Sequence, residues 1–140
     1  MPQDSHIGRI GLADLFLDTL PYNAHTTASD ALWAGLPVLT CMGSAFAGRV
    51  AASLLNSVAL PELVTSTIAD YEALAVRLAR DPRLLREMRV KLSENRRTSP
   101  LFDTERFRMG IESAYTTMWT IWQSGDSPRS FGVGEPALAS

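Results

Sequence analysis

Several residue types are scarce in this chain of 140 residues, and each scarcity argues against a class of protein. Cys41 is the only cysteine, so no disulfide forms within the chain and a reducing, cytoplasmic location is expected. Apolar runs stay shorter than the roughly 18 residues that a membrane span needs, so no membrane partner is predicted. The N-terminal residues lack the basic and apolar regions of a signal peptide.

Basic residues are scarce in the first half of the chain. The net charge is −2, which gives no basic footprint for a nucleic-acid partner. Ten of the 13 Lys and Arg residues lie between Arg77 and Arg108, and Lys91 is the only lysine. Any binding or chemistry in the first 76 residues must therefore draw its basic side chains from a short set: His6, Arg9, His25 and Arg49.

Helices and strands are predicted to alternate in the first 60 residues. Residues 14–18 and 37–40 are short apolar runs typical of buried strands, and helices are expected over 5–12, 26–33 and 46–56. Strand, helix and strand joined by short connections form a βαβ unit, which implies parallel strands and a right-handed crossover.

After Pro61 the pattern becomes helical. Helices are predicted from Thr67, from 81 to 96 and from 103 to 123, with capping residues at their starts. The arginines from 77 to 97 are interpreted as solvated helix faces. We predict one compact domain over 1–124 and a loose tail over 125–140. Six helices with two or three strands indicate an α/β fold with only part of a doubly wound sheet, so we expect a chain that starts partway through a domain.

Residues 23–30, Asn-Ala-His-Thr-Thr-Ala-Ser-Asp, carry the most informative local pattern. They lie between the end of a predicted strand and the start of a helix, where ligands bind in open parallel sheets. A helix N-terminus suits a phosphate, and His25, Thr26 and Thr27 add hydrogen-bond donors there. Asp30 lies one turn further and can accept both hydroxyls of a ribose. The alternative is ordinary N-capping, with Asp30 only favouring the helix dipole.

Residues 30–40, Asp-Ala-Leu-Trp-Ala-Gly-Leu-Pro-Val-Leu-Thr, resemble the helix, glycine and strand signature of the GT-B glycosyltransferases. Further short matches lie between residues 12 and 119. Over residues 1–124 the chain is therefore similar to the O-linked N-acetylglucosamine transferase family, which includes SPINDLY-type and bacterial tetratricopeptide-repeat members. The resemblance implies a partial Rossmann-like C-terminal lobe. It also implies a UDP-sugar donor, UDP-N-acetylglucosamine first, and Ser or Thr hydroxyls of proteins as acceptors.

The resemblance implies a role for each of six residues. His6 matches an imidazole that stacks on uracil, and Arg9 a basic residue near the base. The pyrophosphate site is matched by His25, Thr26 and Thr27, and the ribose carboxylate by Asp30. Gln3 departs from the lysine that animal members carry near the ribose. Because SPINDLY-type members transfer fucose, the choice between UDP and GDP sugars stays open.

The implied reaction is an inverting transfer that needs no metal or other cofactor. No Asp-x-Asp pair is present, and Asp14 and Asp18 flank a buried strand where they point poorly for a metal. A helix N-terminus with hydroxyls and a histidine can balance the leaving diphosphate instead. The family's diphosphate lysine and its acid–base groups are expected upstream of this chain, so the catalytic residues are unknown and the chain alone is expected to be inactive.

Other interpretations remain open. The chain also fits another GT-B sugar-nucleotide enzyme, such as an epimerase or a small-molecule glycosyltransferase, or a non-catalytic remnant that serves as an interaction module. The aromatic stripe of residues 107–122 either closes a local core or promotes self-association. Arg49 is expected in a structural ion pair, with a position facing the sugar or the acceptor as the alternative, and Cys41 is expected in the core.

Overall fold

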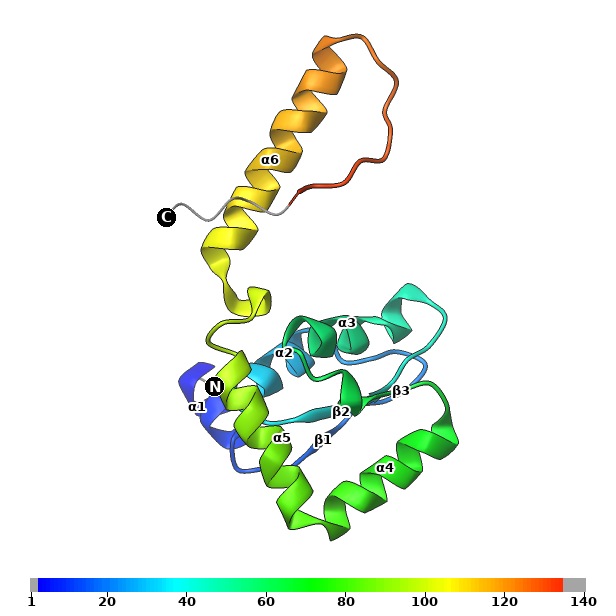
Figure 1. The fold of residues 1–140 in the computed structure, drawn as a ribbon, viewed down its shortest axis with the longest axis vertical. Helices are drawn as coiled ribbons and strands as arrows, with labels where there is room; N and C mark the ends of the chain where they lie inside the picture. Colours follow the sequence, from blue (N-terminus) through cyan, green and yellow to red (C-terminus); the bar gives the residue numbers. More distant parts are fainter. Residues whose placement is uncertain (1–2, 135–140) are drawn as a thin grey trace. The chain divides into compact units, whose positions relative to one another are not determined.

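The computed structural model describes residues 3–134 (Figure 1). The chain forms two compact units, Met1–Leu101 and Phe102–Ser140, and each is described by itself. The tail after residue 124 belongs to the same unit as the last helix. The predicted domain boundary at residue 124 stays a prediction.

A small parallel sheet forms the centre of the first unit. Its strands are β1 (Phe16–Leu17), β2 (Val38–Cys41) and β3 (Val64–Thr65), in the order β1-β2-β3. Phe16 pairs with Val38, and Thr40 pairs with Val64. The predicted α/β fold with a parallel βαβ unit is therefore confirmed, and the third strand is β3.

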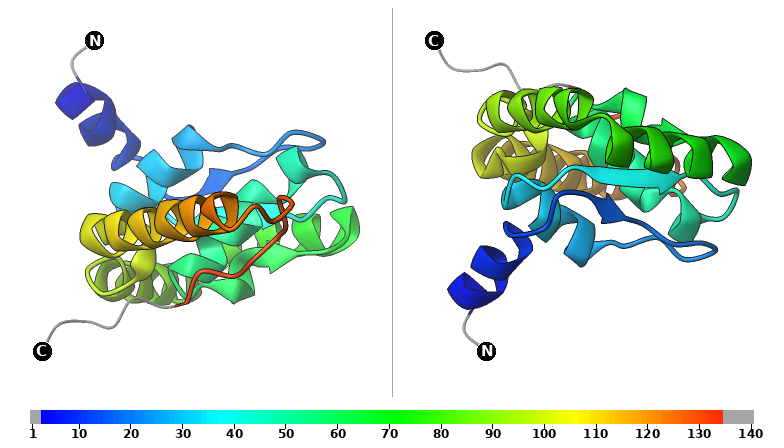
Figure 2. Two further views of the ribbon diagram at one scale, coloured as in Figure 1. Left: turned by 90° about the horizontal axis from the view of Figure 1, so that it is seen from above. Right: turned by 90° about the horizontal axis from the view of Figure 1, so that it is seen from below.

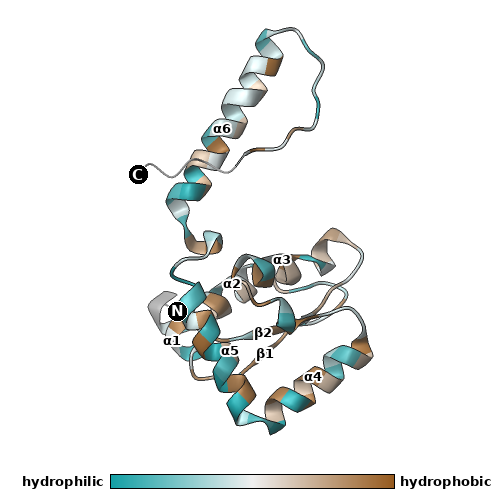
Figure 3. Ribbon diagram, in the orientation of Figure 1, coloured by the Kyte–Doolittle hydropathy of each residue, from teal (hydrophilic) through white to brown (hydrophobic). Residues whose placement is uncertain are grey.

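Four α-helices cover this sheet, and Figures 1 and 2 show α2 and α3 on one face with α4 and α5 on the other. A fifth helix, α1, packs against α2. The helices are α1 (Gln3–Ile10), α2 (Thr26–Trp33), α3 (Val50–Ser57), α4 (Ile68–Arg80) and α5 (Pro82–Asn95). Apolar and polar residues alternate along α4 and α5 at helical spacing (Figure 3). The core consists mainly of aliphatic side chains that are wholly buried, including Leu32, Val38, Leu39, Leu55, Val58 and Leu92.

The predicted helix starts at Thr67 and Asp81 are confirmed. The Thr67 hydroxyl accepts a hydrogen bond from the Asp70 amide at 3.1 Å. Asp81 Oδ1 accepts hydrogen bonds from the amides of Arg83 and Leu84 at 3.1 and 3.0 Å. Side-chain acceptors of this kind satisfy amides that the first helical turn leaves without partners.

The helix predicted over 46–56 is divided. A 3₁₀ turn, η1 (Phe46–Gly48), precedes α3. Gly48 is buried here, and a Cβ atom on it would lie 3.1 Å from the Pro21 carbonyl oxygen and 3.2 Å from Gly43 Cα. Close packing of three backbone segments therefore replaces the first turn of the expected helix.

Two of the arginines interpreted as solvated are in fact structural, so that interpretation is wrong for them. The Arg89 guanidinium donates to the carbonyl oxygen of Ala13, just before β1. Arg96 Nη1 donates to the Trp33 carbonyl oxygen at 2.6 Å, at the C-terminal end of α2. A cation at that end of a helix also interacts favourably with the helix dipole.

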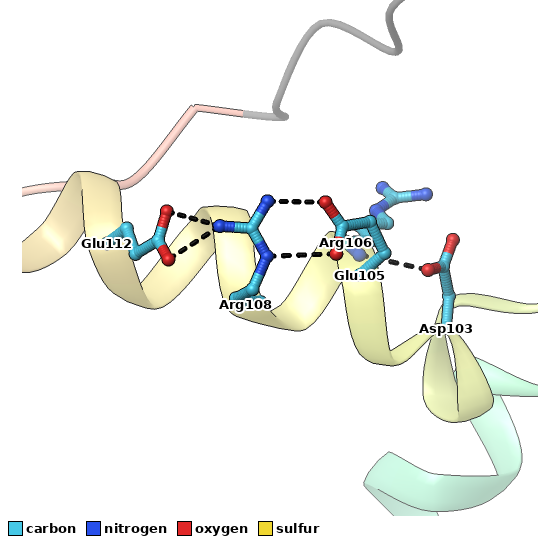
Figure 4. Close-up of polar contacts among 5 residues, drawn as sticks. All are labelled: Asp103, Glu105, Arg106, Arg108 and Glu112. Atoms are coloured by element: carbon cyan, nitrogen blue, oxygen red, sulfur yellow. Dashed lines mark hydrogen bonds and ion pairs between the residues drawn. The ribbon is translucent and has the colours of Figure 1, made fainter.

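The second unit is built on α6 (Thr104–Gln123). Arg108 bridges Glu105 and Glu112 along one face of this helix, and Asp103 caps it through the Arg106 amide at 2.9 Å (Figure 4). The Arg108 guanidinium lowers the pKa of Glu105. Within this unit an apolar stripe remains uncovered: Phe107, Ile111, Tyr115, Met118, Trp119 and Trp122. Within residues 3–134, no helix has the length and apolar character needed to cross a membrane.

Candidate nucleotide site

The candidate site lies at the N-terminus of α2, beyond the carboxyl ends of the parallel strands. His25 is the N-cap residue, and no side chain caps the first amides of the helix. No acidic residue lies in its first turn. Open amides at a helix N-terminus, together with the partial positive charge of that end, form an environment that favours an anion.

Two loops, 18–25 and 42–49, pack against each other beside this helix end. The Ala47 carbonyl oxygen accepts the Asn23 amide at 3.0 Å, and the His25 ring nitrogen Nε2 lies 3.3 Å from the same oxygen. The Tyr22 ring stacks on the His25 ring, with centroids 4.8 Å apart, and Phe46 approaches that ring edge-on at 6.3 Å. The position of His25 is thus set by both loops.

The contact with Ala47 limits what His25 can donate to a ligand. A carbonyl oxygen only accepts, so Nε2 carries a hydrogen when this bond is made. A neutral imidazole then has Nδ1 as an acceptor, whereas an imidazolium donates from both nitrogens. His25 can therefore donate to an oxyanion while it keeps the Ala47 bond only as the cation.

His6 and Asp30 are brought together although 24 positions separate them in the sequence. His6 Nε2 of α1 lies 3.7 Å from Asp30 Oδ2 of α2, and both side chains are partly exposed. Arg9 is exposed one turn further along α1 and makes no ion pair within the described residues. Gln3 begins α1, but its side chain lies outside the described part of the structure.

The six residues named from the sequence therefore form two neighbouring groups. His25, Thr26 and Thr27 surround the start of α2. Asp30 continues that helix by one turn and meets His6, with Arg9 on the same helix as His6. A shallow hollow at the helix start is lined by residues of the 18–25 loop and by Thr27. A larger hollow of 580 Å³ lies beside β1; most of its lining is aliphatic, and Asp14, Arg86 and Arg89 also line it. We place the site at the smaller one, because the uncapped start of α2 lies there.

Sequence reasoning missed the role of Asp18, which it considered only as a poor metal ligand. The side chain is buried, and Oδ1 accepts hydrogen bonds from the amides of Thr19 and Ala24 at 2.9 and 2.7 Å. Oδ2 accepts from the Thr40 hydroxyl at 2.7 Å. The signal in the sequence was an acidic residue directly after an apolar strand and before a loop that contains proline.

The backbone of Asp18 is held as firmly as its side chain. The Tyr71 hydroxyl of α4 donates to the Asp18 carbonyl oxygen at 2.7 Å. Burial raises the pKa of Tyr71, and the nearby Asp18 carboxylate and Cys41 thiol raise it further. The phenol therefore stays protonated and able to donate. Cys41 itself is buried and free, as predicted.

Two other expectations can be compared with the structure. Arg49 is exposed and makes no ion pair within residues 3–134, so the predicted structural ion pair is wrong. It lies at the start of α3 beside a hollow that Ser53 and Asn56 also line. The described residues contain no cluster of three or more His, Cys, Asp or Glu side chains arranged to hold a metal ion.

Comparison with known proteins identifies relatives along most of the chain. It is 43% identical over 123 residues to a probable UDP-N-acetylglucosamine–peptide N-acetylglucosaminyltransferase SPINDLY of Hordeum vulgare, covering 88% of this chain and 13% of that protein. It is 40% identical over 137 residues to the corresponding SEC protein of Arabidopsis thaliana, covering 97% of this chain and 14% of that protein. The chain thus spans about one seventh of the length of these relatives.

A solved structure agrees with the sequence relatives. A mutant of the Thermobaculum terrenum O-GlcNAc transferase matches this fold with a TM-score of 0.78 and 36% sequence identity. The match covers 89% of this chain and 24% of that one, so the fold is that of a part of a GT-B transferase. Residues 1–111 match the family described as glycosyl transferase family 41. From its sequence, its fold and its relatives, the chain belongs to glycosyl transferase family 41.

Proposed function

We propose that this chain binds the nucleotide part of a UDP-sugar, UDP-N-acetylglucosamine first, within a transferase that modifies Ser or Thr hydroxyls of proteins. One observation carries the proposal. The uncapped N-terminus of α2, with two threonines and a histidine, lies one helical turn from the paired side chains of His6 and Asp30. An anion-binding helix end beside an imidazole and a carboxylate matches the diphosphate, base and ribose of one nucleotide.

In this proposal each part of the nucleotide meets a different group. The diphosphate accepts hydrogen bonds from the first amides of α2, from Thr26 and Thr27 and from protonated His25. Asp30 accepts from the ribose hydroxyls, His6 stacks on the base and Arg9 lies near it. The charge that develops on the leaving diphosphate is balanced by fixed donors, which supports a metal-independent transfer. The inverting outcome rests on the family resemblance alone.

The proposal assigns catalysis to parts of the transferase that this chain does not contain. The chain covers 24% of the solved relative and 13–14% of the two plant relatives. Lys91 of α5 is the only lysine in the chain, and its Nζ lies 2.6 Å from Glu62 Oε1. No lysine is thus at hand for the diphosphate, and we propose that the chain alone binds donor in the cytoplasm but does not turn it over.

The test is titration of the chain with UDP, GDP and uridine in the presence of EDTA, followed by calorimetry and by NMR shifts of the Thr26 and Thr27 amides. UDP is expected to bind without metal. His6→Ala is expected to weaken UDP about tenfold or more, the scale of a lost base stack. Asp30→Ala is expected to weaken UDP and uridine alike. Asp126→Ala removes an exposed carboxylate far along the sequence and serves as the matched control.

Each other outcome supports an alternative. Stronger binding of GDP than of UDP would indicate a fucose donor. Binding of UDP combined with transfer only to small molecules, when the chain is joined to the rest of the transferase, would favour another sugar-nucleotide enzyme. If the folded chain binds none of the three compounds, the nucleotide-site proposal is wrong and a non-catalytic interaction module becomes the better account.

A further inference from the structure

We infer that Asp18 is a positioning residue, whose buried carboxylate sets the 18–25 loop so that the start of α2 faces the diphosphate. The inference rests on the proposed diphosphate site and concerns a buried residue that lines the same hollow but is not among the six residues proposed to contact the nucleotide. Ala24 directly precedes the N-cap residue His25, and its amide donates to Asp18 Oδ1 at 2.7 Å across six positions of sequence. The carboxylate thus fixes the point at which the chain enters the helix.

The other contacts of Asp18 show that the carboxylate is itself immobile. The backbone amide of Asp18 donates to the Leu39 carbonyl oxygen at 3.0 Å, which continues the pairing of β1 with β2. Oδ2 accepts from Thr40 of β2, and the carbonyl oxygen of Asp18 accepts from Tyr71 of α4. Bonds with Leu39 and Tyr71 thus hold the backbone of Asp18, the bond from Thr40 holds Oδ2, and Oδ1 holds the loop.

The network extends into the sheet beyond Thr40. The Thr65 hydroxyl of β3 donates to the Thr40 carbonyl oxygen at 3.0 Å, and both threonines are buried. Hydrogen bonds from buried hydroxyls are costly to lose, because an unpaired partner stays out of reach of water. A chain of bonds therefore runs from β3 through Thr40 and Asp18 to Ala24, next to the candidate site.

The charge of Asp18 also decides which amides stay open for a ligand. Its oxygens take up the amides of Thr19 and Ala24 and leave the first amides of α2 unpaired. A carboxylate accepts through both oxygens, whereas an asparagine amide accepts through only one. An aspartate carboxylate can therefore accept from both loop amides and from the Thr40 hydroxyl at the same time, whereas an asparagine would have to donate to the Thr40 oxygen.

Asp18→Ala tests the inference in the full chain with two independent readouts. Hydrogen exchange of the Ala24 amide is expected to accelerate at least about tenfold, while exchange at Leu39 in β2 stays slow. The affinities for UDP and inorganic pyrophosphate are expected to fall about tenfold to a hundredfold, the scale on which misplaced binding groups lose effect. The affinity for uridine, which lacks the diphosphate, is expected to change less than about threefold on the same reasoning.

Two control variants separate positioning from general stability. Tyr71→Phe removes the bond to the Asp18 carbonyl oxygen and leaves the carboxylate in place. This variant is expected to lower the thermal stability without a selective loss of affinity for pyrophosphate. Asp18→Asn keeps one oxygen for Ala24, so it should restore most of the pyrophosphate affinity lost in Asp18→Ala. If Asp18→Ala does not fold, Asp18→Ser takes its place, because serine is one carbon shorter than aspartate and carries a single oxygen; faster exchange at Ala24 and an unchanged uridine affinity are expected.

The inference and the proposed function fail separately. If the unaltered chain binds neither UDP nor pyrophosphate, the proposed function is contradicted, and exchange at Ala24 still decides the role of Asp18. Unchanged exchange at Ala24 in Asp18→Ala, or in Asp18→Ser where that variant takes its place, overturns the inference. Equal losses of uridine and pyrophosphate affinity overturn it as well, because they indicate a general structural role.

Discussion

Replacing Gly48 with alanine is expected to destabilise the first unit and to weaken nucleotide binding at the same time. The added Cβ atom would lie 3.1 Å from the Pro21 carbonyl oxygen and 3.2 Å from Gly43 Cα. Both neighbours are backbone atoms, so neither can rotate away as a side chain would. The 18–25 and 42–49 loops must separate by a few tenths of an ångström, and overpacking of a buried site costs about 1–3 kcal/mol.

The same separation acts on the candidate site, because Ala47 lies next to Gly48. Its carbonyl oxygen holds the Asn23 amide at 3.0 Å and contacts the His25 ring at 3.3 Å. A shift of this loop therefore moves His25, the residue at the N-cap position of α2. We expect the affinity for UDP to fall in Gly48→Ala, and the affinity for uridine to fall less.

Urea unfolding followed by circular dichroism measures the effect on stability. With a slope of about 1–3 kcal/mol per molar urea, the midpoint should fall by on the order of 1 M. Gly110→Ala is the matched control, since a Cβ atom at Gly110 meets nothing within 4 Å and the residue lies inside α6. That variant should gain about 0.5–1 kcal/mol from helix propensity. A Gly48→Ala midpoint equal to or above that of the unaltered chain would refute the reasoning.

Two further predictions concern the helices outside the site. Hydrogen bonds from the amides of Leu84 and Arg83 lower the pKa of Asp81 below its ordinary value of 3.8. The unfolded state therefore binds more protons, so this carboxylate stabilises the fold above that value and stops doing so as the pH falls through the folded-state pKa. Urea midpoints of Asp81→Asn and the unaltered chain should differ at pH 7 and draw closer as the pH falls below 3.8, and a constant difference contradicts this. The uncovered apolar stripe of α6 should make the isolated chain self-associate, and Trp119→Gln with Trp122→Gln should reduce its mass in light scattering. A monomer at high concentration argues against that interpretation.

Local signals in the sequence predicted the elements well wherever a capping residue or a glycine marks an end. The helix predicted over 26–33 is α2 (Thr26–Trp33), because Gly35 adopts a positive φ of 82° directly beyond it. The helices that begin after Thr67 and Asp81 are located by their own side-chain caps. Each of these signals involves residues that lie no more than about four positions apart, so it can be recognised in a single sequence.

Long-range contacts were harder to predict. The divided helix at 46–57 follows from packing of Gly48 against Pro21, which lies 27 positions earlier. Arg89 and Arg96 seemed to be part of an exposed charged face, and only the fold shows that carbonyl oxygens of Ala13 and Trp33 lie beside them. The predicted roles of His6 and Arg9 came from the family resemblance alone, because no spacing rule in the sequence links α1 to α2. The bonds of Asp18 with Thr40 and Tyr71 likewise join residues that nothing in the sequence connects.

The α2 helix is held at both ends by residues distant in the sequence. The two packed loops fix its start through Ala47, and Arg96 of α5 fixes its end through the Trp33 carbonyl oxygen. Its amide dipoles therefore point in a set direction before any ligand arrives, and little reorganisation is needed when an anion binds. Preorganisation of this kind predicts that an anion associates without a preceding conformational step, so differences in affinity among variants should appear mainly in the dissociation rate.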